Sequence, residues 1–289
     1  CKYLSNILGG FIMKIKKLLK TLLIILLCFV LSVIVQNISM LWHIVSIWSV
    51  EYILHALTYI VLSYFSVKWF IEIVLKSNMK DYRIIPVKFF KSCFLIGLIL
   101  ILVIDLIYLL FIPGKLIIPH YSTSVGFMEM FFSAFLITGI AAPIFEEMVF
   151  RGILMRYFEK QYGILFGIII PSILFSLVHL FNGELKGENL LLLLIGGSIA
   201  GIMYAVTAWT FNSIWASAIL HMLWNINGLL NITTQDDHWG VYQYILETKN
   251  VLITGGDYGM DTSLLSICSY IAVIIVMIVT KRHFNFLLK

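Results

Sequence analysis

The sequence predicts an all-α, polytopic membrane protein with about eight transmembrane helices. Of its 289 residues, 61% are hydrophobic and 12% are charged, whereas a soluble domain carries about 25% charged residues. The mean hydropathy is +1.00, and the apolar residues gather in stretches long enough to cross a bilayer. A few charged and amide side chains lie inside those stretches, where an unpaired charge is costly.

The N-terminal part of the chain, residues 1–120, is expected to hold three spans. Residues 21–50 contain no Asp, Glu, Lys or Arg, and this run is too long for a cleaved signal peptide, which is the competing interpretation. A second span is expected near 52–74. The third lies near 92–112 and ends at the breaker pair Pro113-Gly114.

The rest of the chain, residues 121–289, is expected to form the core with five more spans. The fourth span begins near residue 125 and passes through Pro143, and the others lie near 164–181, 189–207, 213–231 and 263–280. Small residues form one face of the span near 189–207, namely Gly196, Gly197, Ala200 and Gly201. This pattern predicts close packing against a neighbouring helix.

Basic residues gather in alternate connections, which predicts that both termini are cytoplasmic. The cytoplasmic set is Lys14, Lys16, Lys17, Lys20, Lys68, Lys76, Lys80, Arg83, Lys88, Lys91, Arg151, Arg156, Lys160, Lys281 and Arg282. The opposite connections hold Lys115, Lys186 and Lys249 with four aspartates, and the longest of them spans 232–262. The net charge of +5 is therefore interpreted as setting topology at an anionic lipid surface, and no nucleic acid is expected as a partner.

The four cysteines, Cys1, Cys28, Cys93 and Cys268, show no CxxC spacing. Neither a disulfide nor a zinc knuckle is expected from them. Two readings of the N-terminus stay open, because Cys1 fits a processed lipoprotein and Met13 ahead of the lysines fits a start site. The Ile- and Lys-rich composition and the short loops favour a bacterial cell-membrane protein.

Three polar patches inside the predicted spans require a chemical explanation. The first is Glu146-Glu147 with Arg151, the second is His179 with Phe175, and the third is His221 with Asn225. Residues four apart share a helix face, so His221 and Asn225 point the same way and Glu147 can pair with Arg151. Glu146 points about 100° away from Glu147. It is therefore free for a reacting centre.

Depth along the helices predicts that the patches meet. The expected turn at Gln161-Tyr162-Gly163 places Glu146 and His179 each roughly 23–25 Å away along antiparallel helices. His221 lies roughly 13 Å past the turn at Phe211-Asn212-Ser213. It reaches the same level only if the hairpin of the fourth and fifth helices projects into the cytoplasm.

The patches fit peptide hydrolysis, in which a carboxylate and a histidine activate water and a His–Asn pair donates to the oxyanion. The competing chemistry is zinc bound through Glu146, His179 and His221, although the HExxH spacing is missing. A serine mechanism is weak because no GxSxG is present. A structural polar network, or an ion path in a transporter, is the non-catalytic alternative.

The order and spacing of these residues resemble the CPBP family, the CAAX protease and bacteriocin-processing intramembrane proteases related to type II CAAX prenyl endopeptidases. The family motifs EExxxR, FxxxH and HxxxN stand here as Glu146–Arg151, Phe175–His179 and His221–Asn225. The resemblance covers roughly residues 130–231 and is intact at every motif position. On this basis residues 121–289 are expected to be the protease core.

The resemblance implies an eight-helix glutamic-type endopeptidase with an intramembrane polar active-site cavity open to the cytoplasmic side, in a family historically called metalloproteases. Its catalytic set would be Glu146, Glu147, Arg151, His179, His221 and Asn225, with no cofactor expected and zinc as the alternative. Glu146 and His179 would activate water, while His221 and Asn225 would form the oxyanion hole. The implied substrate is a peptide or protein at the membrane, lipidated or bacteriocin-like. A non-catalytic bacteriocin self-immunity protein is the alternative from another class.

Overall fold

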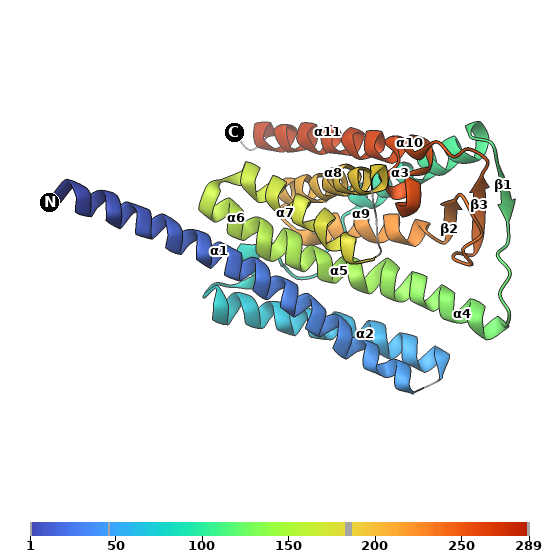
Figure 1. Cartoon of the computed structure of the whole chain (residues 1–289), viewed down its shortest axis with the longest axis horizontal. Helices are drawn as coiled ribbons and strands as arrows, with labels where there is room; N and C mark the ends of the chain where they lie inside the picture. The colour runs from blue at the N-terminus through green and yellow to red at the C-terminus, as the bar shows by residue number, and fades with distance from the viewer. Residues whose placement is uncertain (1, 46, 183–186, 288–289) are drawn as a thin grey trace.

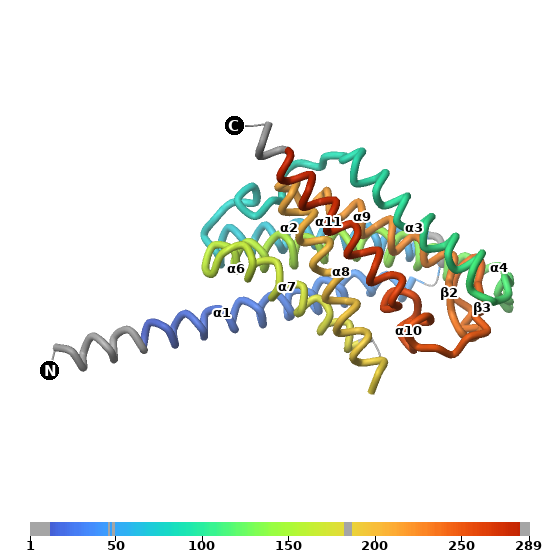
Figure 2. Tube along the Cα trace, turned by 90° about the horizontal axis from the view of Figure 1, so that it is seen from above, coloured from blue at the N-terminus to red at the C-terminus, as the bar shows by residue number. Residues whose placement is uncertain are grey.

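The computed structural model describes residues 2–45, 47–182 and 187–287, with side chains placed outside 2–11, 48–49, 182 and 284–287. Cys1 and Lys186, which entered the sequence argument, lie outside the described residues. The N-terminal end of α1 and the C-terminal end of α11 lie at one end of the molecule, and a small sheet lies at the opposite end (Figures 1 and 2). Cys28, Cys93 and Cys268 are all free thiols.

The first half of the chain forms three long helices that match the first three predicted spans. The elements are α1 (Lys2–Met40), the 3-10 turn η1 (Leu41–Ile44), α2 (Trp48–Trp69), the π-helical η2 (Phe70–Val74), the 3-10 turn η3 (Met79–Tyr82) and α3 (Lys91–Phe111). Large apolar side chains on the outer faces of α1, α2 and α3 are exposed. This exposure fits helices that face lipid rather than water.

One continuous helix from residue 124 to residue 162 carries the acidic motif. Its parts are α4 (Ser124–Phe132), the π-helical η4 (Ser133–Ala141), α5 (Ala142–Glu147), the π-helical η5 (Met148–Leu154) and α6 (Met155–Tyr162). Pro143 stands in the first turn of α5 and lacks the N–H that a regular α-helix would use there. The two π segments lie on either side of the Glu146-Glu147 pair, and Arg151 lies within η5. Such segments are frequent at functional sites.

The second half of the chain contains α7 (Ile164–Val178), the 3-10 turn η6 (His179–Asn182), α8 (Glu188–Phe211), α9 (Ile214–Asn227) and α11 (Leu264–Leu287). Seven helices in the described part of the chain are long and apolar enough to cross a membrane. The helix expected as the seventh of eight spans, α9, has 14 residues and is about 21 Å long, shorter than a bilayer core of about 30 Å. It packs against α3, α5, α8 and η4. The fold class is confirmed, while the count of eight and the cytoplasmic opening stay predictions.

The small-residue face of α8 brings it into close contact with α7. A Cβ atom added at Gly201 would lie 2.8 Å from Cβ and 2.9 Å from Cα of Ser172, and one added at Gly197 would lie 2.8 Å from Oγ of Ser176. The close packing predicted from these residues is therefore present. It fixes the position of α7, the helix that ends at His179.

Three short strands were not expected from the sequence. They are β1 (Gly114–Ile117), β2 (Leu230–Thr233) and β3 (Tyr242–Leu246), in the order β1-β3-β2. Strand β3 pairs antiparallel with β1 and parallel with β2. The short elements α10 (Val251–Thr254), η7 (Gly256–Tyr258) and η8 (Met260–Thr262) complete the connection to α11. The long polar connection is thus folded rather than extended.

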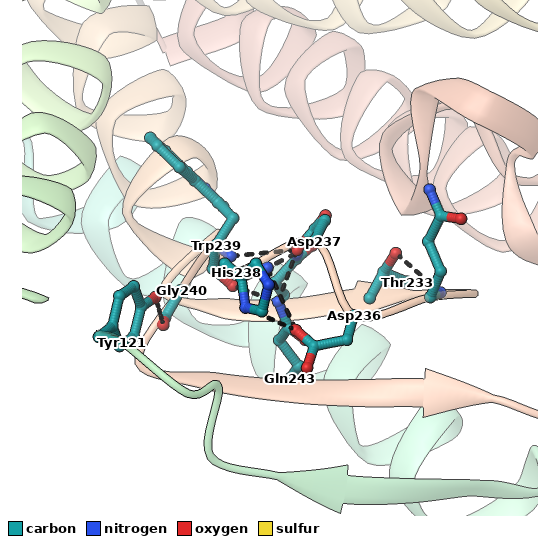
Figure 3. Close-up of polar contacts among 10 residues, drawn as sticks. Tyr121, Thr233, Asp236, Asp237, His238, Trp239, Gly240 and Gln243 are labelled. Atoms are coloured by element: carbon teal, nitrogen blue, oxygen red, sulfur yellow. Dashed lines mark hydrogen bonds and ion pairs between the residues drawn. The ribbon is translucent and has the colours of Figure 1, made fainter. Parts of the chain in front are cut away.

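Asp237 organises the loop between β2 and β3 (Figure 3). Its carboxylate accepts hydrogen bonds from Asn231 Nδ2 at 2.9 Å, from Gln243 Nε2 at 2.5 Å and from the Trp239 backbone N–H at 3.1 Å. Tyr121 donates its hydroxyl to the Gly240 carbonyl at 2.6 Å. These bonds fix the sheet end of the molecule against the start of the 124–162 helix.

Candidate active site

The centre of the site is a buried group of three charged or ionisable side chains. Glu147 Oε1 lies 3.0 Å from Arg151 Nη1 and 3.1 Å from His221 Nδ1. Glu147 and Arg151 are 0% and 1% exposed. The expected Glu147–Arg151 ion pair is therefore present, and it also contacts a histidine from α9. Buried charges persist when they are paired in this way.

Aromatic rings and a backbone carbonyl enclose Arg151. Its guanidinium lies 4.5 Å from the centre of the Phe175 ring and 5.2 Å from that of Tyr204. Nη2 donates to the carbonyl oxygen of Gly201 at 3.1 Å. The glycine face of α8 thus serves the site directly, because it admits α7 and also supplies an acceptor to the arginine.

The His221 ring is held in one plane. Tyr204 stacks against it with ring centres 4.5 Å apart and planes 19° apart. A paired carboxylate can only accept a hydrogen bond. Nδ1 of His221 is therefore protonated and donates the hydrogen bond to Glu147. Nε2 therefore points away from the buried pair, and Glu146 Oε2 lies 3.7 Å from it.

Glu146 differs from its neighbour in exposure. Its side chain is 27% exposed, whereas that of Glu147 is fully buried. Adjacent positions on one helix point to different sides, and here one carboxylate binds the arginine while the other stands beside the free nitrogen of His221.

His179 has its tautomer fixed by the backbone. Nδ1 lies 2.6 Å from the carbonyl oxygen of Phe175, four residues earlier. A carbonyl only accepts hydrogen bonds, so Nδ1 carries the proton and Nε2 keeps a free lone pair. The FxxxH spacing thus has a physical reason, and the Phe175 ring also lies between the two histidines, 4.6 Å from His179 and 5.7 Å from His221.

Asn225 lies one turn after His221 on α9. Its Nδ2 donates to the carbonyl oxygen of Thr138 in the π-helical η4, at 2.9 Å. A primary amide has two N–H donors, so one remains available for another acceptor.

A cavity of about 60 Å³ is lined by His179, His221 and Asn225 together with aromatic and acidic side chains. Since a water molecule needs roughly 10–15 Å³ of such space, the cavity has room for a few waters but not for a peptide. The lining residues that were not expected at the site include Tyr204, Trp224, Tyr258 and Asp261. Of these residues, only Asp261 had a signal in the sequence, namely its charge, and this charge was interpreted as part of the polar connection 232–262.

Asp261 closes one side of this cavity from η8. Its Oδ1 accepts a hydrogen bond from Trp224 Nε1 at 3.0 Å, and the hydroxyl of Tyr270 donates to its backbone carbonyl at 3.0 Å. Burial raises the pKa of the Asp261 carboxyl, and His179 and His221 act in the opposite direction. A carboxyl group therefore shares the cavity with the two histidines.

The residues expected to bind zinc are Glu146, His179 and His221. Glu146 lies beside His221, and no hydrogen bond or ion pair joins Glu146 to His179 among the described residues. In the same part of the chain, no three His, Cys, Asp or Glu side chains are arranged to hold a metal ion. The described residues therefore give no support for the expected zinc set.

The fold and the site together define a polytopic integral membrane protein with a buried glutamate–arginine–histidine centre. Residues 128–227 match the family described as Rce1-like, type II CAAX prenyl endopeptidase Rce1-like. This match confirms the resemblance predicted from the three motifs, and the matched segment contains all three of them. Asp261 and Tyr258 lie beyond it. No curated protein and no solved structure matches the chain significantly.

Proposed function

We propose that this protein is an intramembrane endopeptidase in which Glu146 and His179 activate a water molecule. The observation that carries the proposal is the unequal use of the two glutamates. The Glu147 carboxylate contacts Arg151 at 3.0 Å and His221 at 3.1 Å. Glu146 is partly exposed, and among the described residues its carboxylate has one ion-pair contact, with His221 at 3.7 Å. A carboxylate without a buried partner is the one that can take a proton.

The reaction would begin with removal of a proton from water by Glu146, assisted by the free Nε2 of His179. The water oxygen then bonds to the carbonyl carbon of the substrate peptide, and the carbonyl oxygen becomes an oxyanion. When the C–N bond breaks, the same groups return a proton to the leaving amine. One water is consumed, and the products are a carboxylate and an amine.

His221 and Asn225 would supply donors to the oxyanion. With Nδ1–H donating to Glu147, His221 can also donate from Nε2 only when both ring nitrogens carry a proton. The second Nδ2 hydrogen of Asn225 would complete the pair. A single donor of this type contributes roughly 10²–10³ in kcat.

We further propose that the reaction needs no metal, because no three His, Cys, Asp or Glu side chains among the described residues are arranged to hold one. Elemental analysis of purified, active protein is the direct test. Stoichiometric zinc that is lost together with activity in the His221→Ala variant would contradict this part of the proposal.

The substrate is proposed to be a peptide or protein at the membrane, either lipidated or bacteriocin-like. The protein is proposed to sit in a bacterial cell membrane with both termini in the cytoplasm. The asymmetry of lysine and arginine between alternate connections supports this orientation.

The experiment compares peptide termini in membranes from cells that carry the wild-type protein or Glu146→Gln. We expect uncleaved peptides to accumulate in the variant, while its melting temperature stays within about 3 °C because the side chain is near the surface of the site. Glu129→Gln changes the same residue type on the same continuous helix and should leave the termini unchanged. Unchanged peptide termini in the Glu146→Gln cells would contradict the proposed mechanism. If those cells also kept resistance to a bacteriocin, the self-immunity alternative would be favoured.

A further inference from the structure

A second cavity, which the proposed chemistry does not use, lies where the N-terminal helix meets the end of the 124–162 helix. Its volume is about 290 Å³, and its lining is polar. Lys20 from α1, Lys76 and Ser77 after η2, Tyr82 from η3, and Tyr157 and Lys160 from α6 all contribute. Three parts of the chain that are far apart in sequence thus build one pocket, which we call the lysine pocket.

The walls of the lysine pocket carry more positive than negative charge. None of the three lysines has a carboxylate within ion-pair distance in the described part of the chain. Of the two acids that act on Lys160, Glu159 is paired with Arg83 and Arg156, and Asp81 is left as one negative charge near three lysines. Three ammonium groups around one cavity repel each other unless an anion joins them.

The floor of the lysine pocket is rigid. Tyr82 and Tyr157 are 4% and 5% exposed, and the Tyr157 hydroxyl lies 3.2 Å from Oγ1 of Thr21 on α1. Lys160 Nζ lies 4.3 Å from the centre of the Tyr82 ring. The pocket is therefore built from packed side chains, with the lysines arranged around a fixed aromatic base.

The backbone at Lys76 ends the helix formed by α2 and η2. This residue adopts φ +52° directly after the C-cap Leu75, and the Ser77 N–H donates to the Ile71 carbonyl oxygen at 3.0 Å. A left-handed residue is common at this position of a helix end. The helix end therefore places Lys76 at the rim of the cavity that Lys20 and Lys160 also line.

We propose that the lysine pocket binds a phosphate-bearing anion, either the headgroup of an anionic phospholipid or a soluble phosphate ester. Ammonium groups, a serine and tyrosines offer donors to phosphate oxygens. The residues around the pocket favour the lipid source. The polar helix α6 ends at Tyr162, and Lys17 Nζ lies 4.1 Å from the centre of the Tyr162 ring. Tyrosines and lysines gather at this level of a membrane protein.

Binding there would join α1 to the active-site helix. Lys17 donates to the Gln161 carbonyl oxygen at 3.0 Å, and Thr21 meets Tyr157, so an anion between Lys20, Lys76 and Lys160 would reinforce the same junction. The inference concerns binding alone and stands whether or not the protein cleaves peptides.

The test uses purified, delipidated full-length protein and measures lipid retention by native mass spectrometry. The probes are phosphatidylglycerol, zwitterionic phosphatidylcholine and free glycerol phosphate. The pocket variant is Lys20→Gln/Lys76→Gln/Lys160→Gln. The matched control, Lys14→Gln/Lys16→Gln/Lys88→Gln, removes the same charge from exposed lysines of the N-terminal helix and of the connection between α2 and α3, none of which lines the pocket.

We expect phosphatidylglycerol to bind the wild-type protein in preference to phosphatidylcholine. The pocket variant should lose about tenfold or more of that affinity, while the control stays within about threefold, because each pocket lysine contributes a local interaction. Competition by glycerol phosphate at equal concentration would identify a soluble source, and its failure would identify the lipid. Equal losses in the two triple variants, or unchanged binding in the pocket variant, would overturn the proposal.

Lys76→Gly provides a variant in which folding is protected, since glycine relieves the left-handed backbone while removing the ammonium. We expect a melting temperature at or above that of the wild type, with a loss of phosphatidylglycerol affinity. An unchanged affinity in this folded variant would exclude Lys76 from the site and contradict the proposed pocket.

Discussion

Glu147 and His221, 74 positions apart in the chain, meet inside the protein at 3.1 Å between Oε1 and Nδ1. The same carboxylate oxygen lies 3.0 Å from Nη1 of Arg151. The contact links the helix of the acidic motif to α9 and determines which nitrogen of His221 faces Glu146. The geometry of the site therefore depends on a residue that does not itself reach the cavity.

Glu147→Gln should destabilise the protein severely, because it leaves the Arg151 cation buried without a carboxylate. Breaking a buried pair in this way costs about 3–5 kcal/mol. The double variant Glu147→Gln/Arg151→Leu removes both charges and should recover most of that loss, as measured by melting temperature in detergent. Activity should not return with it, because His221 has lost its anchor. Equal stability of the single and double variants would contradict a structural role for the pair.

Tyr204 should act through the position of the His221 ring rather than through its hydroxyl. Tyr204→Phe keeps the stacked ring and should retain activity within about threefold. Tyr204→Ala leaves a cavity beside His221 and should cost about 3–5 kcal/mol in stability. Comparing kcat with melting temperature for the two variants separates the effects. A Tyr204→Phe variant that is folded but inactive would show that the hydroxyl participates in the reaction.

Gly201→Val should push α7 and α8 apart. The added Cβ would approach Ser172 Cβ to 2.8 Å and its backbone to 2.9 Å, a form of overpacking that costs about 1–3 kcal/mol or more. Activity should fall along with stability, because α7 ends at His179. Gly126→Ala is the matched control, since its Cβ would meet only Thr123 Oγ1 at 3.4 Å. A tolerated Gly201→Val would contradict the role of the small-residue face.

Asp261 should make stability depend on pH. Burial raises the pKa of its carboxyl, so the folded protein holds this proton to higher pH than the unfolded chain does. Its contribution to stability is therefore present at low pH and is lost as the pH rises through the folded-state pKa.

Asp261→Asn should flatten this dependence, because an amide oxygen can still accept from Trp224 but does not ionise. Melting temperatures of the wild type and the variant at several pH values above 4 provide the measurement. The matched control Asp257→Asn changes an acid in the same connection outside the cavity. Parallel pH profiles for the wild type and Asp261→Asn would refute the assignment.

Much of the fold followed from local patterns in the sequence. Apolar stretches located the long helices, Pro113-Gly114 ended α3 and Gly163 ended α6, because each signal acts within a few residues. The Glu147–Arg151 pair followed from its i,i+4 spacing, even though Arg151 lies in a π-helical segment. By contrast, β1 and β3 pair across more than a hundred residues, and four- and five-residue strands carry too short a pattern to predict.

The sequence by itself determined that this is a helical membrane protein, which residues form the polar motifs, and which glutamate pairs with Arg151. Only the tertiary structure decided that Glu147 also contacts His221, that Tyr204 stacks on that ring, and that Asp261 closes the cavity. It alone brought Lys20, Lys76 and Lys160 around one pocket. Helical periodicity specifies which side of a helix a residue occupies. The neighbour that this side meets depends on how distant helices pack, and no local pattern encodes that choice.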